Sequence, residues 1–117
     1  MEKKFEEKEH EKLVRILKNY LEEQGYDVKI EPDTTMYAGV KSDMEAKKGK
    51  DFLCIEVVNG KDIDTPEIRK KWEAISGNRE CDFSLFVTKE KEKKVKELLE
   101  KWAIYFRKLW TYSPEDL

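Results

Sequence analysis

The chain has 117 residues, 43% of them charged, and a formal net charge of −2 at pH 7. This length predicts a single domain over residues 1–117, large enough for a sheet covered by helices. Because the two signs of charge nearly balance, DNA binding would need a local basic patch. No run reaches the ~20 apolar residues of a membrane span, so we expect a cytoplasmic protein that makes no membrane contact.

Lys and Glu dominate the charged residues, and Arg is rare. Such a composition is typical of hyperthermophile proteins, although an AT-rich genome would produce the same lysine bias. The two cysteines, Cys54 and Cys81, fall in apolar, strand-like runs and lack the close spacing of zinc ligands. We therefore expect both to be buried, reduced thiols.

The N-terminal part of the chain predicts one helix and one strand. From Lys4 to Gln24 apolar residues recur at helical spacing, and Gly25 follows as a helix stop. Residues 26–31 alternate between apolar and polar up to Pro32, which predicts a half-buried strand. A looser stretch around residues 33–35 leads into residues 36–40, and the next element follows.

A hairpin is predicted around Gly49-Lys50. If these two residues form a type II′ turn, with Gly supplying the positive φ, Lys48 pairs with Asp51. Counting outward along both strands then places Asp43 directly opposite Glu56.

The C-terminal half predicts a helix, a strand and a second helix. Thr65 and Pro66 are a good N-cap and first helical residue, and this helix should stop at Gly77. Residues 82–88 are typical of a central strand covered on both faces. A long last helix is expected from about Lys89 through Leu109. The resulting helix, strand, hairpin, helix, strand, helix order predicts an α/β sandwich with a mixed sheet.

Asp43 and Glu56 are the strongest candidates for a functional site. Opposed side chains in an antiparallel pair lie roughly 4.5–5.5 Å apart at Cβ, so two carboxylates there repel each other unless a cation lies between them. Glu56 also interrupts the apolar run of residues 52–58, where a buried acid without a partner costs several kcal/mol. The pair therefore indicates a divalent metal site.

These features resemble the PD-(D/E)XK nuclease superfamily, which includes restriction endonucleases and archaeal Holliday junction resolvases. The resemblance rests on residues 42–46 (Ser-Asp-Met-Glu-Ala), the Gly49 turn, residues 55–58 (Ile-Glu-Val-Val) and the helix that opens at Thr65. It implies a three-layer restriction endonuclease-like core and cleavage of DNA phosphodiester bonds. It also implies that Asp43 and Glu56 bind Mg²⁺ or Mn²⁺.

The family's motif lysine is missing, because Val58 occupies its position. Lys41 lies opposite Val58 in the predicted register and is the first candidate to replace it, and Lys61 is the second. In this superfamily a catalytic side chain can migrate to a neighbouring element. The alternative is an inactive member of the fold that binds nucleic acid or another protein.

Further candidates come from the helices. Glu6 and His10 share the apolar face of the first helix, and Glu6, as a hard oxygen donor, is the better candidate for a third metal ligand. A basic patch for phosphates is expected from lysines and an arginine at the turn and on the middle helix: Lys48, Lys50, Arg69 and Lys70, with Lys47 and Lys71 beside them. The C-terminal helix carries more aromatic residues than one face can bury, which predicts a homodimer contact or a closed core: Trp102, Tyr105, Phe106, Trp110 and Tyr112.

Overall fold

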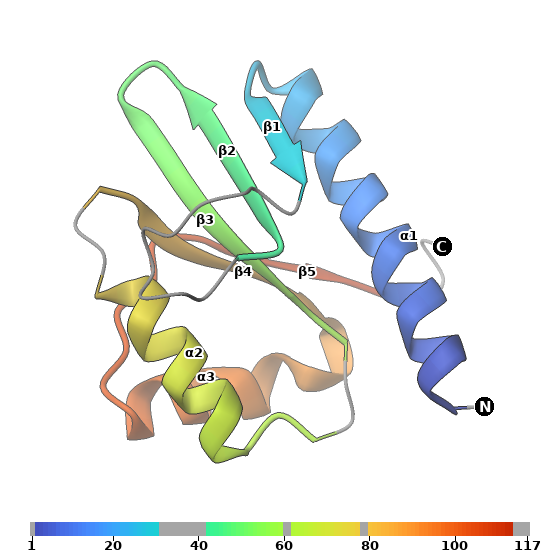
Figure 1. Cartoon of the computed structure of the whole chain (residues 1–117), viewed down its shortest axis with the longest axis vertical. Coiled ribbons are helices and arrows are strands. Elements are labelled where there is room, and N and C mark those ends of the chain that lie inside the picture. Colours follow the sequence, from blue (N-terminus) through green and yellow to red (C-terminus); the bar gives the residue numbers. More distant parts are fainter. Residues whose placement is uncertain (1, 31–41, 60–61, 78–79, 114–117) are drawn as a thin grey trace.

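The computed structural model describes residues 2–30, 42–59, 62–77 and 80–113, with side chains from residue 8 onward. Three α-helices and a five-stranded mixed sheet form an α/β domain (Figure 1). The elements in chain order are α1 (Glu2–Glu23), β1 (Asp27–Ile30), β2 (Met44–Lys48), β3 (Asp51–Val58), α2 (Pro66–Ser76), β4 (Asp82–Thr88), a 3-10 turn η1 (Lys89–Lys91), α3 (Glu92–Lys101) and β5 (Leu109–Tyr112).

The strands lie in the order β1-β2-β3-β4-β5. The first three pair antiparallel, whereas β3, β4 and β5 run parallel. The two parallel connections are made through α2 and α3, as expected for crossovers in one sheet. The mixed sheet predicted from the sequence is therefore confirmed.

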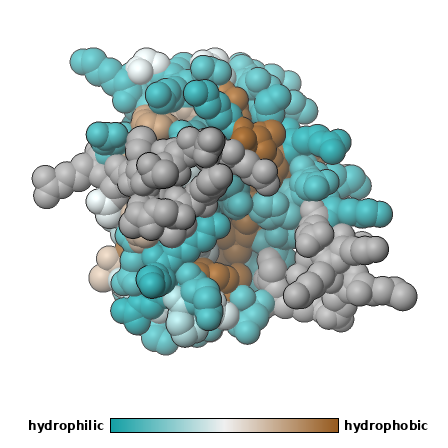
Figure 2. All heavy atoms as spheres, in the orientation of Figure 1, coloured by the Kyte–Doolittle hydropathy of each residue, from teal (hydrophilic) through white to brown (hydrophobic). Residues whose placement is uncertain are grey.

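Helices cover both faces of the sheet, with α1 on one face and α2 and α3 on the other (Figure 1). Period-two alternation along β3 separates the two cores. Leu53, Ile55 and Val57 pack towards α1, and Cys54 and Val58 towards the other two helices. The face seen in Figure 2 is mostly hydrophilic, with small apolar areas.

The β2–β3 hairpin has the predicted register, with Lys48 opposite Asp51 and Met44 opposite Ile55. Gly49 has a φ of 60°, which is the positive value that the turn requires at this position. The start of α2 is also confirmed, since Thr65 Oγ1 accepts a hydrogen bond of 3.2 Å from the amide of Ile68.

The prediction of one long C-terminal helix is wrong, because α3 ends at Lys101 and the chain returns to the sheet as β5. Ala103, with a φ of 53°, ends the helix in the left-handed region. Its amide donates to the carbonyl of Glu100, and the amide of Ile104 donates to that of Leu99, which is the Schellman pattern. Alanine at the position where glycine is usual costs about 1–2 kcal/mol and hides the stop from a reading of the sequence.

The C-terminal aromatic residues consequently do not form one helical stripe. Trp102 and Phe106 pack between the sheet and α2 and α3, whereas Trp110 and Tyr112 pack on the α1 side. Tyr105, which is 74% exposed, stays outside both cores. The predicted homodimer through an aromatic C-terminal helix therefore loses its structural basis.

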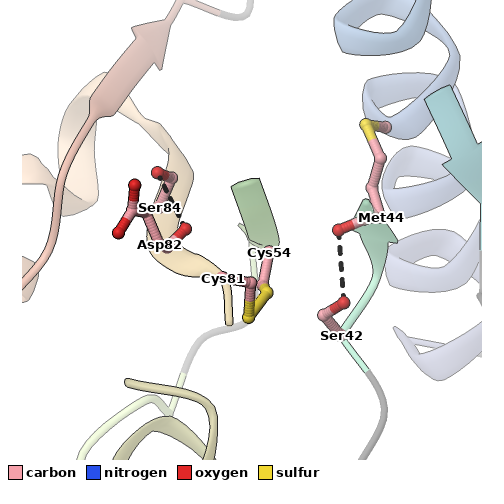
Figure 3. Close-up of a disulfide and its surroundings, with 6 residues drawn as sticks. All are labelled: Ser42, Met44, Cys54, Cys81, Asp82 and Ser84. Carbon is pink, nitrogen blue, oxygen red and sulfur yellow. Dashed lines mark hydrogen bonds between the residues drawn. A yellow bond between two sulfur atoms is a disulfide. The ribbon is translucent and has the colours of Figure 1, made fainter. Parts of the chain in front are cut away.

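The two cysteines form a disulfide, which corrects the expectation of reduced thiols (Figure 3). Cys54 lies in β3 and Cys81 directly before β4, with their Cα atoms 5.9 Å apart. Parallel pairing of the two strands, which no spacing in the sequence reveals, brings them together. Persistent disulfides are typical of oxidising compartments and of the cytoplasm of hyperthermophiles.

None of the helices within the described ranges has the length and apolar character needed to cross a bilayer.

Reduction of the disulfide should lower the free energy of unfolding. The bond joins residues separated by 27 positions, and the loss of chain entropy in the unfolded state predicts a stabilisation of about 3–4 kcal/mol. Urea denaturation of the oxidised and reduced wild-type chain would measure it. Two reactive thiols in denaturant without reductant would contradict the bond itself.

Candidate functional site

The end of the hairpin away from its turn brings together side chains from α1, β3, α2 and the residue before β2. Figure 1 shows this end of β3 between α2 and the N-terminal half of α1. A pocket of about 210 Å³ opens here. Its polar wall includes His10, Asp43, Glu56, Asp62 and Lys71.

Glu56 is the most buried acid of the site, with a side chain only 6% exposed. Its Oε2 accepts a contact of 3.0 Å from Lys71 Nζ, whereas Oε1 is buried without a hydrogen-bond partner among the described residues. Burial, and then the charge of Asp43, raise the pKa of Glu56 to about 8, although Lys71 opposes the shift. Without a metal, the Glu56 carboxyl group therefore keeps its proton to a higher pH than an ordinary glutamate, and a cation that binds it has to displace that proton.

Asp43 lies immediately before β2, at the position where the register continues to Glu56. Its Oδ2 accepts a hydrogen bond of 2.8 Å from the amide of Val57 and lies 3.3 Å from His10 Nε2. The Val57 amide of β3 and the His10 side chain of α1 therefore orient the Asp43 carboxylate. Both contacts are made by Oδ2, so no described residue engages Oδ1, the second oxygen that a ligand could use.

Lys71 brings a positive charge to the pocket from the middle of α2. Burial opposes protonation of its amine, but the carboxylates of Glu56 and Asp43 outweigh burial and raise its pKa. The Lys71 amine therefore stays protonated and acts as a hydrogen-bond donor.

His10 faces the site from α1. Its hydrogen bond to Asp43 raises its pKa against the opposing effect of burial. In its charged form it acts as a counter-ion that holds Asp43 in place.

The donors suit Mg²⁺ better than a metal that needs a complete protein cage. Within the described residues no group of three or more His, Cys, Asp and Glu side chains is arranged to hold a metal ion. Mg²⁺ is commonly bound through one or two carboxylates, with water and substrate phosphate as the other ligands. Glu56 Oε1 and Asp43 Oδ1 provide two hard oxygens on the same pocket, so the pair fits such an ion.

The other predicted site residues are placed as follows. Lys41 and Lys61 lie outside the described residues, as does the side chain of Glu6, a residue of α1. Val58 is buried in the core beneath α2 and α3.

The predicted basic patch is divided between two places. Lys48 and Lys50 stand at the hairpin turn, at the other end of β3 from Glu56, and Lys48 Nζ donates to the carbonyl of Gln24 at 2.6 Å. Arg69 and Lys70 are exposed on α2, where Arg69 pairs with Glu73 at 3.5 Å.

The sequence analysis treats Lys71 only as part of a basic run and does not predict its place in the site. Its spacing from the apolar residues of the helix does indicate that place. Lys71 is three residues after Ile68 and four before Ile75, so it borders the inward face of the helix, whereas Lys70 points elsewhere.

Comparison of the chain with family models, with curated proteins and with solved structures finds no match.

Replacing Glu56 with Gln should change how stability depends on pH. The carboxyl pKa is about 8 in the folded chain against an ordinary value of 4.5, so the folded state binds more protons than the unfolded state between these values. The stability of the wild type should therefore fall as pH rises from about 4.5 to 8, more steeply than that of Glu56→Gln. Thermal melts in EDTA across this range measure the difference, and parallel curves would contradict the raised pKa.

Proposed function

We propose that this chain is a metal-dependent nuclease of the PD-(D/E)XK class that cleaves DNA phosphodiester bonds. Asp43 and Glu56 hold Mg²⁺ or Mn²⁺, and Lys71 provides the cationic side chain. The observation that carries the proposal is Glu56. Its carboxyl group is buried, one of its oxygens has no hydrogen-bond partner among the described residues, and it shares a pocket with a second carboxylate and a lysine.

A divalent cation at such a site lowers the pKa of a bound water and stabilises charge on the phosphate under attack. The residues of the chain have complementary tasks. Asp43 and Glu56 orient the ion, while His10 and the Val57 amide fix the direction of the Asp43 carboxylate. Lys71, kept protonated by its neighbours, donates a hydrogen bond to a phosphate oxygen rather than accepting a proton.

Lys71 takes the part that the superfamily resemblance assigned to the position of Val58. Val58 lines the pocket, but its apolar side chain cannot donate a hydrogen bond to a phosphate. Lys71 lines the same pocket, and its Nζ lies 3.0 Å from Glu56 Oε2. Migration of the ammonium group from β3 to α2 keeps a cation next to the two carboxylates.

The second candidate function is an inactive member of this fold that binds nucleic acid or a protein. Two observations favour it, namely the apolar side chain of Val58 at the lysine position and the net charge of −2. In this case the Lys71–Glu56 contact is an ion pair that neutralises a buried acid. Saturable binding without metal-dependent cleavage is the result that would support it.

Mn²⁺ at millimolar concentration should raise the melting temperature of the wild type. An ion that binds the folded chain alone stabilises it by about 2.7 kcal/mol at a hundredfold excess over Kd. The rise should be absent in Asp43→Asn and in Glu56→Gln, because each removes an anionic ligand. A control variant, Asp64→Asn, changes an exposed acid that does not line the pocket and should keep the response. An unchanged wild-type midpoint would contradict the metal site.

Cleavage of supercoiled, single-stranded or branched DNA with Mg²⁺ or Mn²⁺ tests the activity. We expect Asp43→Ala and Glu56→Ala to lose at least about 100-fold in rate, the scale of losing a key electrostatic group. Lys71→Met should lose a similar factor, because methionine keeps most of the length of the side chain without its charge. Lys41→Met should lose much less.

Thermal melting checks that each variant is folded, since removing one partner of a buried ion pair destabilises the folded state. Cutting that survives both carboxylate substitutions would remove the proposal. A loss in Lys41→Met but not in Lys71→Met would return the lysine role to Lys41.

A further inference from the structure

We propose that Arg15 forms a phosphate-binding position beside the catalytic pocket, where it holds the phosphate next to the one that is cleaved. The inference rests on the proposed nuclease function. It makes a polynucleotide strand, rather than an isolated phosphodiester, the substrate class of the site.

A second pocket of about 130 Å³ lies between α1 and the end of β1. His10 and Asp43 line this pocket as well as the larger one, so the two hollows adjoin at these residues. Their lining side chains extend from Lys71 on α2, past Asp43 and Glu56, to Arg15 on α1. Lys71 lines the larger pocket and Arg15 the smaller one, each with a further acid, Asp62 and Glu11 respectively.

Arg15 is exposed and makes no ion pair or hydrogen bond with another described residue. The other two described arginines differ, since Arg69 pairs with Glu73, and Arg107 contacts Asp51 and Asp82. An uncommitted guanidinium presents a planar set of donors that matches a phosphate group in bidentate fashion. Arg15 therefore has its full capacity for an incoming anion.

The rest of the second pocket suits the parts of a nucleotide that carry no charge. Val14 and Ile30 supply its apolar wall, and Ile30 is 42% exposed at the end of an edge strand. A sugar or a base can pack on such a surface while its phosphate meets the guanidinium.

Glu11 also lines this pocket, one helical turn before Arg15. Its charge opposes a phosphate at the same place. Removal of this carboxylate should therefore strengthen the binding that removal of the guanidinium weakens, which gives two variants with opposite expected signs.

The test compares two substrates with Mn²⁺, a single-stranded oligonucleotide and bis(p-nitrophenyl) phosphate, which has one diester and no neighbouring phosphate. For the oligonucleotide we expect Arg15→Gln to raise KM roughly 5–10-fold, with a smaller change in kcat, and Glu11→Gln to lower KM. The increase in KM that Arg15→Gln causes for the small diester should be several-fold smaller than the increase for the oligonucleotide. In Arg15→Gln, the slope of log KM against log salt concentration for the oligonucleotide should be smaller by about 0.7, which is the contribution of one phosphate contact to a single strand.

Lys18→Gln is the matched control, since it removes one positive charge from α1 at a residue that pairs with Glu22 and lines neither pocket. Equal effects of Arg15→Gln and Lys18→Gln on the oligonucleotide would overturn the proposal, as would equal losses of Arg15→Gln on both substrates.

If the wild type cleaves neither substrate, the nuclease proposal fails by itself. Fluorescence anisotropy with a labelled oligonucleotide then decides the role of Arg15. Weaker binding by Arg15→Gln than by Lys18→Gln supports the phosphate position, and equal binding overturns it.

Discussion

A buried carboxylate in the central strand is the constraint on which the site depends. Glu56 lies in β3, which pairs with β2 on one side and β4 on the other, and Glu56 itself is paired with Leu85 of β4. A charge at this depth is unfavourable unless it is neutralised by a proton, a lysine or a metal ion. Lys71 contacts one carboxylate oxygen, and the other has no hydrogen-bond partner in the part of the chain that the structure describes.

The three-layer arrangement explains how so small a domain assembles charged groups around this acid. The sheet sets Asp43 beside Glu56, α2 delivers Lys71 from one face, and α1 delivers His10 from the other. His10 and Lys71 line the same pocket at the end of the hairpin away from its turn. Local cations can thus gather in a chain whose net charge is −2.

The disulfide restrains the same region. Cys54 precedes Glu56 by two residues and shares its side of β3, and the bond to Cys81 closes a loop that contains the whole of α2 (Figure 3). Both residues that form the buried ion pair therefore lie within one covalently closed segment. A disulfide together with a Lys- and Glu-rich composition is a combination found among hyperthermophile proteins.

Local chemistry in the sequence was sufficient for the elements with strong signals. The Gly49 turn determined the hairpin register and so the facing of Asp43 and Glu56, and Thr65 and Pro66 determined where α2 begins. These features depend on neighbours in the chain, so a reading of the residues captures them.

Only the tertiary structure decided the features that depend on distant contacts. The stop of α3 at Ala103 uses a left-handed alanine that packing tolerates, and the return of the chain as β5 follows from it. Cys54 and Cys81 meet because β3 and β4 pair in parallel. Lys71 enters the site because the crossover sets α2 over the end of β3 that carries Glu56, and the pairing of elements far apart in the chain leaves no local pattern to read.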